Sequence, residues 1–280
     1  MLPDRPHEWI ALLQRLADRA DAVALRYFRV PSLAVFHKTD RSPVTEADRE
    51  IEREIRALAQ EAAPTLGLLG EEYGELPGAS GVRLIVDPID ATLNFVRGDP
   101  VFATLLAIEV HGQVVAGLVS APALPGRWWA ARGAGAWRDG CPIRVSARRE
   151  LAGCRLFCGT PADEVARARY PLEPLLAATH PVQGVGDFLQ HLWVAEGRGE
   201  IAIDLDVAPW DIAALQIIVE EAGGTATTLD GRHTLGGGTL LTTNGWVHAA
   251  ALACLEPAQA VRGARVPVAI HAIASPLRDL

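Results

Sequence analysis

Several features that define other classes of protein are missing or scarce in this chain of 280 residues. Its four cysteines lack the paired spacing of zinc sites, and no histidine cluster accompanies them, so we expect buried free thiols of a reducing cytosol. No apolar run reaches about 18 residues, which predicts that no segment spans a membrane. The first residues lack a cationic patch followed by an apolar core, which predicts no signal peptide.

Positive charge is also scarce. Lysine and arginine total 26 against 34 aspartates and glutamates, for a net charge of −8. This balance argues against a general nucleic-acid binder, because phosphate backbones need basic patches. It also means that an anionic substrate would need bound cations to neutralise its site. Hydrophobic content of 49% and charged content of 21% are typical of a globular protein.

What the chain does contain is acidic residues where predicted strands end, above all in residues 84–95, LIVDPIDATLNF. The apolar run LIV predicts a short buried strand that stops at Asp87-Pro88, since proline donates no ladder hydrogen bond. Asp90 follows, and a helical turn then offers free backbone N–H groups. The carboxylates suit a hard cation such as Mg2+, and the N–H groups suit a phosphate. An Asp-Pro turn with Asp90 as a helix cap explains the stretch equally well.

Other acids have a similar double interpretation. Asp48 follows Thr45 by three residues at a predicted helix start, so it either belongs to a cap or faces a metal site. Asp211 stands at the start of another helix, where capping is the simpler role. Glu71 and Glu72 follow a short strand, and in an extended chain only one of them could face a common site.

Periodicity predicts the main elements. Residues 7–28 and 209–222 have apolar side chains at three- and four-residue steps, which favours amphipathic helices. Residues 200–205 alternate as a strand does, and Gly223-Gly224 is a strong helix stop.

Four motifs in order, PVTEAD, GEE, DPIDATLNF and WDIAALQIIVEEAGG, resemble the inositol monophosphatase superfamily of Mg2+-dependent, lithium-sensitive sugar and small-molecule phosphatases. The runs FVRGDPVFATLLAIEV, GLVSAPALPGRWWAARGAGAW and WVAEGRGEIAID are similar to the histidinol-phosphate phosphatases of that superfamily, which act in histidine biosynthesis. The resemblance implies a hydrolase that releases phosphate from a small metabolite.

The same resemblance implies an α/β fold, a five-layer αβαβα sandwich. It implies an α+β half at residues 1–150 that binds metal and phosphate, and an α/β half at 151–256 that contributes the WD motif and the substrate side. A tail follows at 257–280. A cytoplasmic homodimer, binding neither nucleic acid nor membrane, is expected.

Carried onto this sequence, the family pattern implies roughly two or three Mg2+ ions per site. Their expected ligands are Glu71, Asp87, Asp90, Asp211 and the Ile89 carbonyl. The pattern assigns catalytic roles to Asp48, Thr92 and Glu71, of which Asp48 and Thr92 position the attacking water, and phosphate contacts to Asp90, Ala91 and Thr92.

The chain departs from the pattern at Ala91, where the family has glycine. We expect a negative φ there, because the other ligands are intact. For the substrate side, Asp187 and Asp204 are candidate partners of the cationic groups of histidinol, or else a helix cap and a solvent-exposed strand end. The alternatives to histidinol phosphate are inositol 1-phosphate or another sugar or nucleotide phosphate, and, less favoured, a non-catalytic phosphate-binding protein.

Overall fold

A computed structural model describes residues 5–38, 43–124, 126–159 and 169–256 of the chain. Its largest element is an eight-stranded sheet in the order β10-β9-β8-β7-β6-β5-β3-β4. The strands are β3 Gly67–Gly70, β4 Gly74–Leu76, β5 Val82–Asp90, β6 Ala103–Val110, β7 Gln113–Ala121, β8 Gly126–Ala131, β9 Gly135–Arg138 and β10 Cys141–Ile143. Within this sheet as described, only β3 and β5 pair in parallel, so these two strands end on the same side of the sheet.

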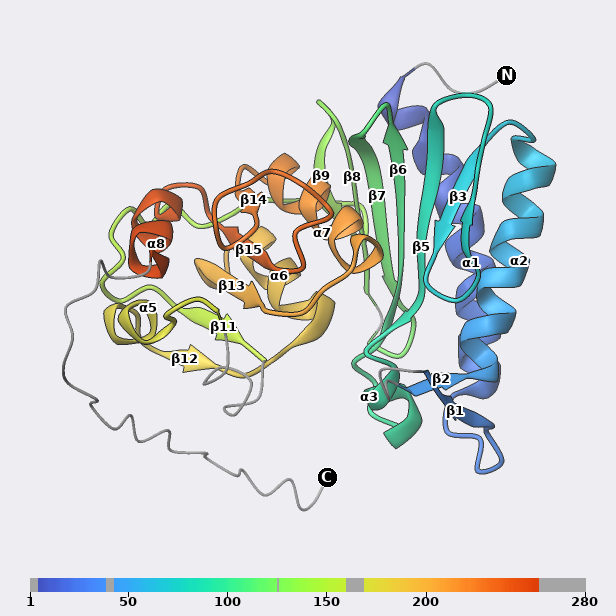
Figure 1. The fold of residues 1–280 in the computed structure, drawn as a ribbon, viewed down its shortest axis with the longest axis horizontal. Coiled ribbons are helices and arrows are strands. Elements are labelled where there is room, and N and C mark those ends of the chain that lie inside the picture. The colour runs from blue at the N-terminus through green and yellow to red at the C-terminus, as the bar shows by residue number, and fades with distance from the viewer. Residues whose placement is uncertain (1–4, 39–42, 125, 160–168, 257–280) are drawn as a thin grey trace.

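Two helices cover one face of this sheet (Figure 1). They are α1 Trp9–Tyr27, which follows the 3-10 turn η1 Pro6–Glu8, and α2 Glu46–Ala62. The apolar stripe of each helix is buried, with Leu13 and Ile51 fully inaccessible, as the periodicity of residues 7–28 predicts. The small sheet of β1 Val35–His37 and β2 Pro43–Thr45 connects the two helices.

The opposite face packs on α6 Asp187–Ala195 and α7 Pro209–Glu221, which lie between the eight-stranded sheet and a five-stranded one (Figure 1). The five-stranded sheet has the order β12-β11-β13-β15-β14. Its strands are β11 Leu156–Cys158, β12 Val182–Gln183, β13 Ile201–Asp204, β14 Thr225–Thr227 and β15 Leu240–Thr243. Helices α5 Glu173–Ala178 and α8 His248–Leu255 form the outer layer. The expected αβαβα sandwich is therefore confirmed.

Strand β5 runs further than the sequence predicts. We expected it to stop at Asp87-Pro88, but it continues to Asp90, and its register with β6 shifts between Asp87 and Asp90. Pro88 is tolerated because it lies in this irregularity, where the ladder is interrupted, and its carbonyl accepts a hydrogen bond from the Thr104 hydroxyl at 2.7 Å. In a regular strand, residues three apart point to opposite faces. The bulge allows both aspartates to reach one site.

Several other expectations concern the chain as a whole. The predicted boundary near residue 150 falls between β10 and β11, and it stays a prediction, because α7 contacts strands of both sheets. Cys154 is buried as expected, whereas Cys141 is exposed on the edge strand β10. Within the described ranges, no helix is long and apolar enough to cross a membrane. The tail at 257–280 lies outside the described residues.

Candidate active site

Three aspartates from distant parts of the chain meet where β5 ends. Asp87 and Asp90 come from the β5 bulge, and Asp211 comes from the first turn of α7. One carboxylate oxygen of each lies within 4.8 Å of the other two. Asp211 reaches this place because the apolar residues that follow it on α7, including Ile212 and Leu215, are buried against the eight-stranded sheet. The first turn of α7 thus completes a cluster that begins at the end of β5.

Asp87 is buried and Asp90 and Asp211 are half-buried, so three acidic groups lie close together with limited access to water. Burial, reinforced by the charges of Glu71 and Asp90, raises the pKa of Asp87 well above its ordinary 3.8. Burial and the charge of Asp187 do the same to the pKa of Asp90. Burial also raises the pKa of Asp211 to about 7. Burial and mutual repulsion thus disfavour the charged forms of these carboxylates, and a bound cation would favour them.

The donor set fits a hard divalent cation. All the clustered donors are carboxylate oxygens, which Mg2+ and similar ions prefer. The Oδ1 atom of Asp87 is buried without a hydrogen-bond partner, so the folded protein leaves a ligand position unused there. A cation at this point would neutralise the repulsion and satisfy that oxygen.

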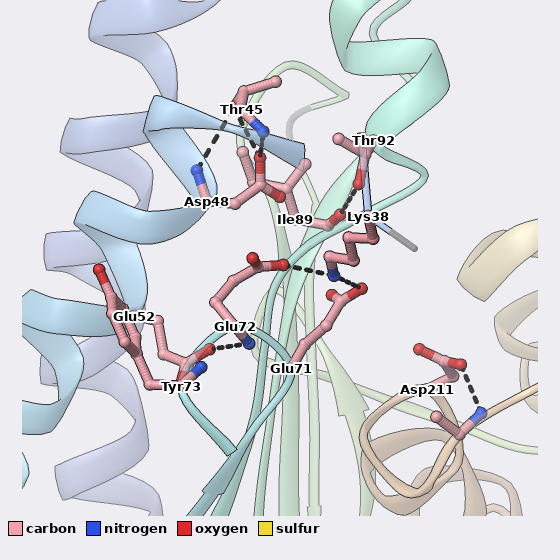
Figure 2. A network of polar contacts seen from close by, with 11 residues as sticks. Lys38, Thr45, Asp48, Glu52, Glu71, Glu72, Tyr73, Ile89, Thr92 and Asp211 are labelled. Carbon is pink, nitrogen blue, oxygen red and sulfur yellow. Dashed lines mark hydrogen bonds and ion pairs between the residues drawn. The ribbon is translucent and has the colours of Figure 1, made fainter. Parts of the chain in front are cut away.

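Glu71 lies at the edge of the cluster, joined to an ion pair that the sequence did not predict. Lys38 Nζ is 2.7 Å from Glu71 Oε1 and 2.6 Å from Glu72 Oε1, and Figure 2 shows the lysine between the two glutamates. Both side chains can converge because they follow the end of β3 in a turn instead of an extended strand. Burial alone would lower the pKa of Lys38, but the hydrogen bonds to the glutamates raise it, so the ammonium is firmly protonated.

Asp48 caps a helix, which is one of the two roles that the sequence left open, and its role in the site stays a prediction. Its Oδ2 accepts hydrogen bonds from Thr45 N at 2.8 Å and from Thr45 Oγ1 at 2.6 Å, which completes the capping box of α2 (Figure 2). Its Oδ1 is buried without a partner. Burial raises the pKa of Asp48 to about 7. One oxygen of the carboxylate is therefore structural, and the other is unused.

The turn after Asp90 corrects one expectation. Ala91 has φ 64° and ψ 45°, the left-handed conformation, so the expected negative φ is wrong. The reason is that Ala91 is the N-cap residue of α3 Thr92–Arg97, where the chain reverses abruptly after the bulge of β5. Thr92 follows in the helix, and its hydroxyl donates to the Ile89 carbonyl at 3.0 Å (Figure 2). The Cβ of alanine makes this conformation strained, whereas glycine, which has no Cβ, would adopt it without strain.

Asp187 does not cap a helix. It begins α6 itself, makes no side-chain cap hydrogen bond, and has φ 51°. Its Oδ2 lies 3.4 Å from Asn94 Nδ2, and the N–H of the next residue, Phe188, donates to Asp90 Oδ2 at 2.8 Å. Burial and, to a smaller extent, the negative charge of Asp204 raise the pKa of Asp187 to about 6. The start of α6 is thus tied to the aspartate cluster.

Asp204 is not a solvent-exposed strand end either. Its side chain is 17% exposed, and both carboxylate oxygens are engaged. Oδ1 accepts from Gln190 Nε2 at 2.5 Å, and Oδ2 lies 2.7 Å from His191 Nε2. Neither Gln190 nor His191 was predicted, because nothing in an apolar helix sequence marks them as partners of a strand 13 or 14 residues away.

A cavity of about 240 Å³ adjoins the aspartate cluster. The lining residues are Asp90, Asp187, Phe188, Asp204, Asp206, Val207, Asp211 and Leu215. It brings together the two predicted substrate residues, Asp187 and Asp204, and the cluster aspartates Asp90 and Asp211. Asp206 was missed, although its spacing of two from Asp204 would have indicated a shared side in an extended chain.

The chain is similar to known proteins over most of its length. The model of the inositol monophosphatase family matches residues 5–260. The chain belongs to the inositol monophosphatase family. It is 42% identical to a protein named histidinol-phosphatase from Mycobacterium tuberculosis, over 86% of this chain and 95% of that protein. It is 34% identical to a protein named inositol-1-monophosphatase from Rhizobium meliloti, over 79% and 85% respectively.

The fold comparison agrees. The crystal structure of the extragenic suppressor protein suhB from Bartonella henselae superimposes with a TM-score of 0.81 at 30% identity, covering 89% of this chain and 98% of that one. Family membership, fold and the enzyme class of phosphoric monoester hydrolase are therefore confirmed, and the acidic cluster is a site that could bind metal. The individual roles expected for the site residues stay predictions.

Proposed function

We propose that the protein is a Mg2+-dependent phosphomonoesterase that hydrolyses histidinol phosphate to histidinol and phosphate. The observation that carries this proposal is the charge of the cavity beside the aspartate cluster. Among the described residues that line it, Asp187, Asp204 and Asp206 add carboxylates beyond the cluster, and none is Lys, Arg or His. Histidinol carries an ammonium group and an imidazole that is protonated near neutral pH, so it suits such a wall.

The residues of the cluster have separable roles in this proposal. Glu71, Asp87, Asp90, Asp211 and the Ile89 carbonyl would hold Mg2+. The ions supply neutralisation of the acids and polarisation of the phosphate oxygens. Thr92 and Asp48 would orient the attacking water, and the unpartnered Oδ1 of Asp48 is available to accept its proton. The Ala91 and Thr92 N–H groups would hold the phosphate, and Asp90 would contact it through the cation that it helps to hold.

Inositol 1-phosphate is the second candidate substrate, favoured by the relative of that name at 34% identity. Its leaving group is a neutral polyol, which needs hydroxyl partners more than negative charge. The acidic cavity therefore favours the cationic substrate over the neutral one. From the family resemblance we further propose that lithium inhibits the enzyme, that it acts as a homodimer, and that it works in the cytoplasm.

The test is a phosphate-release panel with Mg2+ and four substrates: histidinol phosphate, inositol 1-phosphate, fructose 1,6-bisphosphate and 3′-phosphoadenosine 5′-phosphate. We expect the highest kcat/KM with histidinol phosphate. Asp187→Asn and Asp204→Asn should raise KM for histidinol phosphate far more than KM for inositol 1-phosphate. Asp230→Asn, which changes an acid outside the cavity, is the control and should leave both values unchanged.

Two outcomes would count against the proposal. A kcat/KM that is higher for inositol 1-phosphate than for histidinol phosphate would identify the enzyme as an inositol-phosphate phosphatase instead. Failure of the expressed, soluble protein to rescue a histidine-requiring strain that lacks its own histidinol phosphatase would contradict a role in histidine biosynthesis. Absence of turnover with every substrate would instead support the non-catalytic alternative.

A further inference from the structure

Two buried polar residues of α6 are not explained by the proposed reaction. Gln190 and His191 are both fully inaccessible, in the middle of a helix whose neighbouring residues Phe188, Leu189 and Leu192 pack in the core. Burying an amide and an imidazole costs free energy unless their hydrogen bonds are made. The Oε1 atom of Gln190 remains without a partner, so apolar residues would stabilise this helix more simply. The contacts of Gln190 and His191 therefore indicate a role other than stabilising the fold.

Both residues converge on Asp204. Gln190 Nε2 donates to Asp204 Oδ1 at 2.5 Å and to the Ile203 carbonyl at 3.1 Å. His191 Nε2 lies 2.7 Å from Asp204 Oδ2, and its Nδ1 lies 2.7 Å from the hydroxyl of the buried Thr242. Successive helical residues project about 100° apart, so the two donors approach the carboxylate from different sides. The strand end that carries Asp204 and the helix are thereby fixed in relative orientation.

The carboxylate needs such support because its surroundings repel it. Asp204 shares the cavity with Asp187, Asp206 and the cluster residues Asp90 and Asp211. An unsupported aspartate at a strand end would turn its charge away from these neighbours toward solvent. A carboxylate has about four lone-pair sites, so two bonds from the α6 side leave acceptor capacity for a ligand in the cavity.

We infer that His191 and Gln190 are positioning residues that hold the Asp204 carboxylate toward the cavity, so that it recognises a cationic group of the leaving alcohol. This inference rests on the proposed function for the identity of the alcohol. Thr242 supports His191 from behind, which extends the positioning chain from β15 through α6 to the end of β13.

The test compares His191→Leu with His191→Gln. Leucine fills the buried site but donates nothing, whereas the Gln Nε2 can donate to Asp204 as the imidazole Nε2 does. We expect His191→Leu to raise KM for histidinol phosphate about tenfold, the loss of roughly one charge-assisted hydrogen bond. Its kcat and its KM for inositol 1-phosphate should change much less. His191→Gln should restore most of the affinity.

The matched control is His248→Leu. His248 is a half-buried histidine between two threonine hydroxyls, Thr227 Oγ1 at 3.2 Å and Thr243 Oγ1 at 3.1 Å, and unlike His191 it is not among the residues beside the cavity carboxylates. It should leave the KM values of both substrates unchanged. If His191→Leu fails to fold, Thr242→Val keeps the histidine and removes its support, and it should shift the same KM in the same direction by a smaller factor.

A double-mutant cycle separates this inference from the proposed function. If His191 acts only through Asp204, then adding His191→Leu to Asp204→Asn changes kcat/KM no further, whichever substrate the wild type prefers. Independent, multiplying losses would overturn the positioning role, as would equal KM increases for both substrates in His191→Leu. A wild-type preference for inositol 1-phosphate would refute the proposed function, and the cycle measured on that substrate would still decide the positioning.

Discussion

Replacing Ala91 by glycine should stabilise the protein, against the general rule that glycine destabilises. Ala91 has φ 64° and ψ 45° at the N-cap of α3. The left-handed conformation costs a residue with a Cβ about 1–2 kcal/mol relative to glycine. Glycine loses about 0.4–1 kcal/mol more conformational entropy on folding, which offsets part of that gain. The partly buried methyl group of Ala91 contributes a further small loss.

The balance predicts that Ala91→Gly stabilises the folded state by about 0.5 kcal/mol, which corresponds to a rise in Tm of about 1–2 °C for a chain of this size. The assay is urea and thermal unfolding of the metal-free protein, followed by kcat/KM with Mg2+. We expect kcat/KM to change little, because glycine keeps the same backbone conformation and the same N–H positions.

The control is Ala222→Gly at the end of α7, where φ is −76°. There alanine is unstrained, so glycine should destabilise by about 0.5–1 kcal/mol. Opposite signs for the two variants are the expected result. If Ala91→Gly lowers the midpoint as much as Ala222→Gly does, the left-handed strain at Ala91 is refuted.

Further predictions concern the acidic cluster. Chelation should abolish turnover and added Mg2+ should restore it, because the clustered donors are all oxygens; full activity without metal would contradict the site. Asp90→Asn and Asp211→Asn should remove most turnover yet stabilise the metal-free fold, since each removes one repelling charge; near-normal turnover in both variants would show that the reaction needs neither acid. For the metal-free protein, burial raises the pKa of Asp211 to about 7 from 3.8, so the folded state binds this proton more tightly than the unfolded state. The stability of the metal-free protein should therefore fall as pH rises from about 4 to about 7, and bound Mg2+ should make this dependence on pH weaker. A Tm of the metal-free protein that rises over this pH range would contradict the raised pKa of Asp211.

Much of the fold could be predicted because its elements have simple periodicity. The apolar stripe of α1 depends on neighbouring residues alone, whereas β13 was found as a strand although its first three residues are all buried and do not alternate. The extension of β5 past Pro88 was missed because it depends on a register shift against β6, which no local pattern reports. The φ of Ala91 was missed for a related reason, since its sign is imposed by the reversal between that bulge and α3.

Side-chain partners were harder to predict than positions. Lys38 and His191 meet acids 33 and 13 residues away, through packing that the sequence does not display. The acids themselves were found because each stands where a strand ends or a helix begins. Such positions bring charge to the edge of a layer, and the sandwich then brings the edges of its layers together.

For Asp211, the two roles that the sequence offered, helix cap and member of an acidic site, do not exclude each other, and Asp48 is a cap whose role in the site stays a prediction. A carboxylate has two oxygens, and the structure uses them separately. Asp48 caps α2 with Oδ2 and leaves Oδ1 buried and unpartnered, while Asp211 accepts the Ala208 N–H at 2.7 Å with Oδ2 and still belongs to the three-aspartate cluster. The cap fixes the orientation of the side chain, because the first turn of a helix is rigidly placed by its packing. Capping thus fixes where α7 holds the Asp211 carboxylate, and we expect it to do the same for Asp48 on α2, so a helix start beside an acidic cluster indicates a site more strongly than either feature alone.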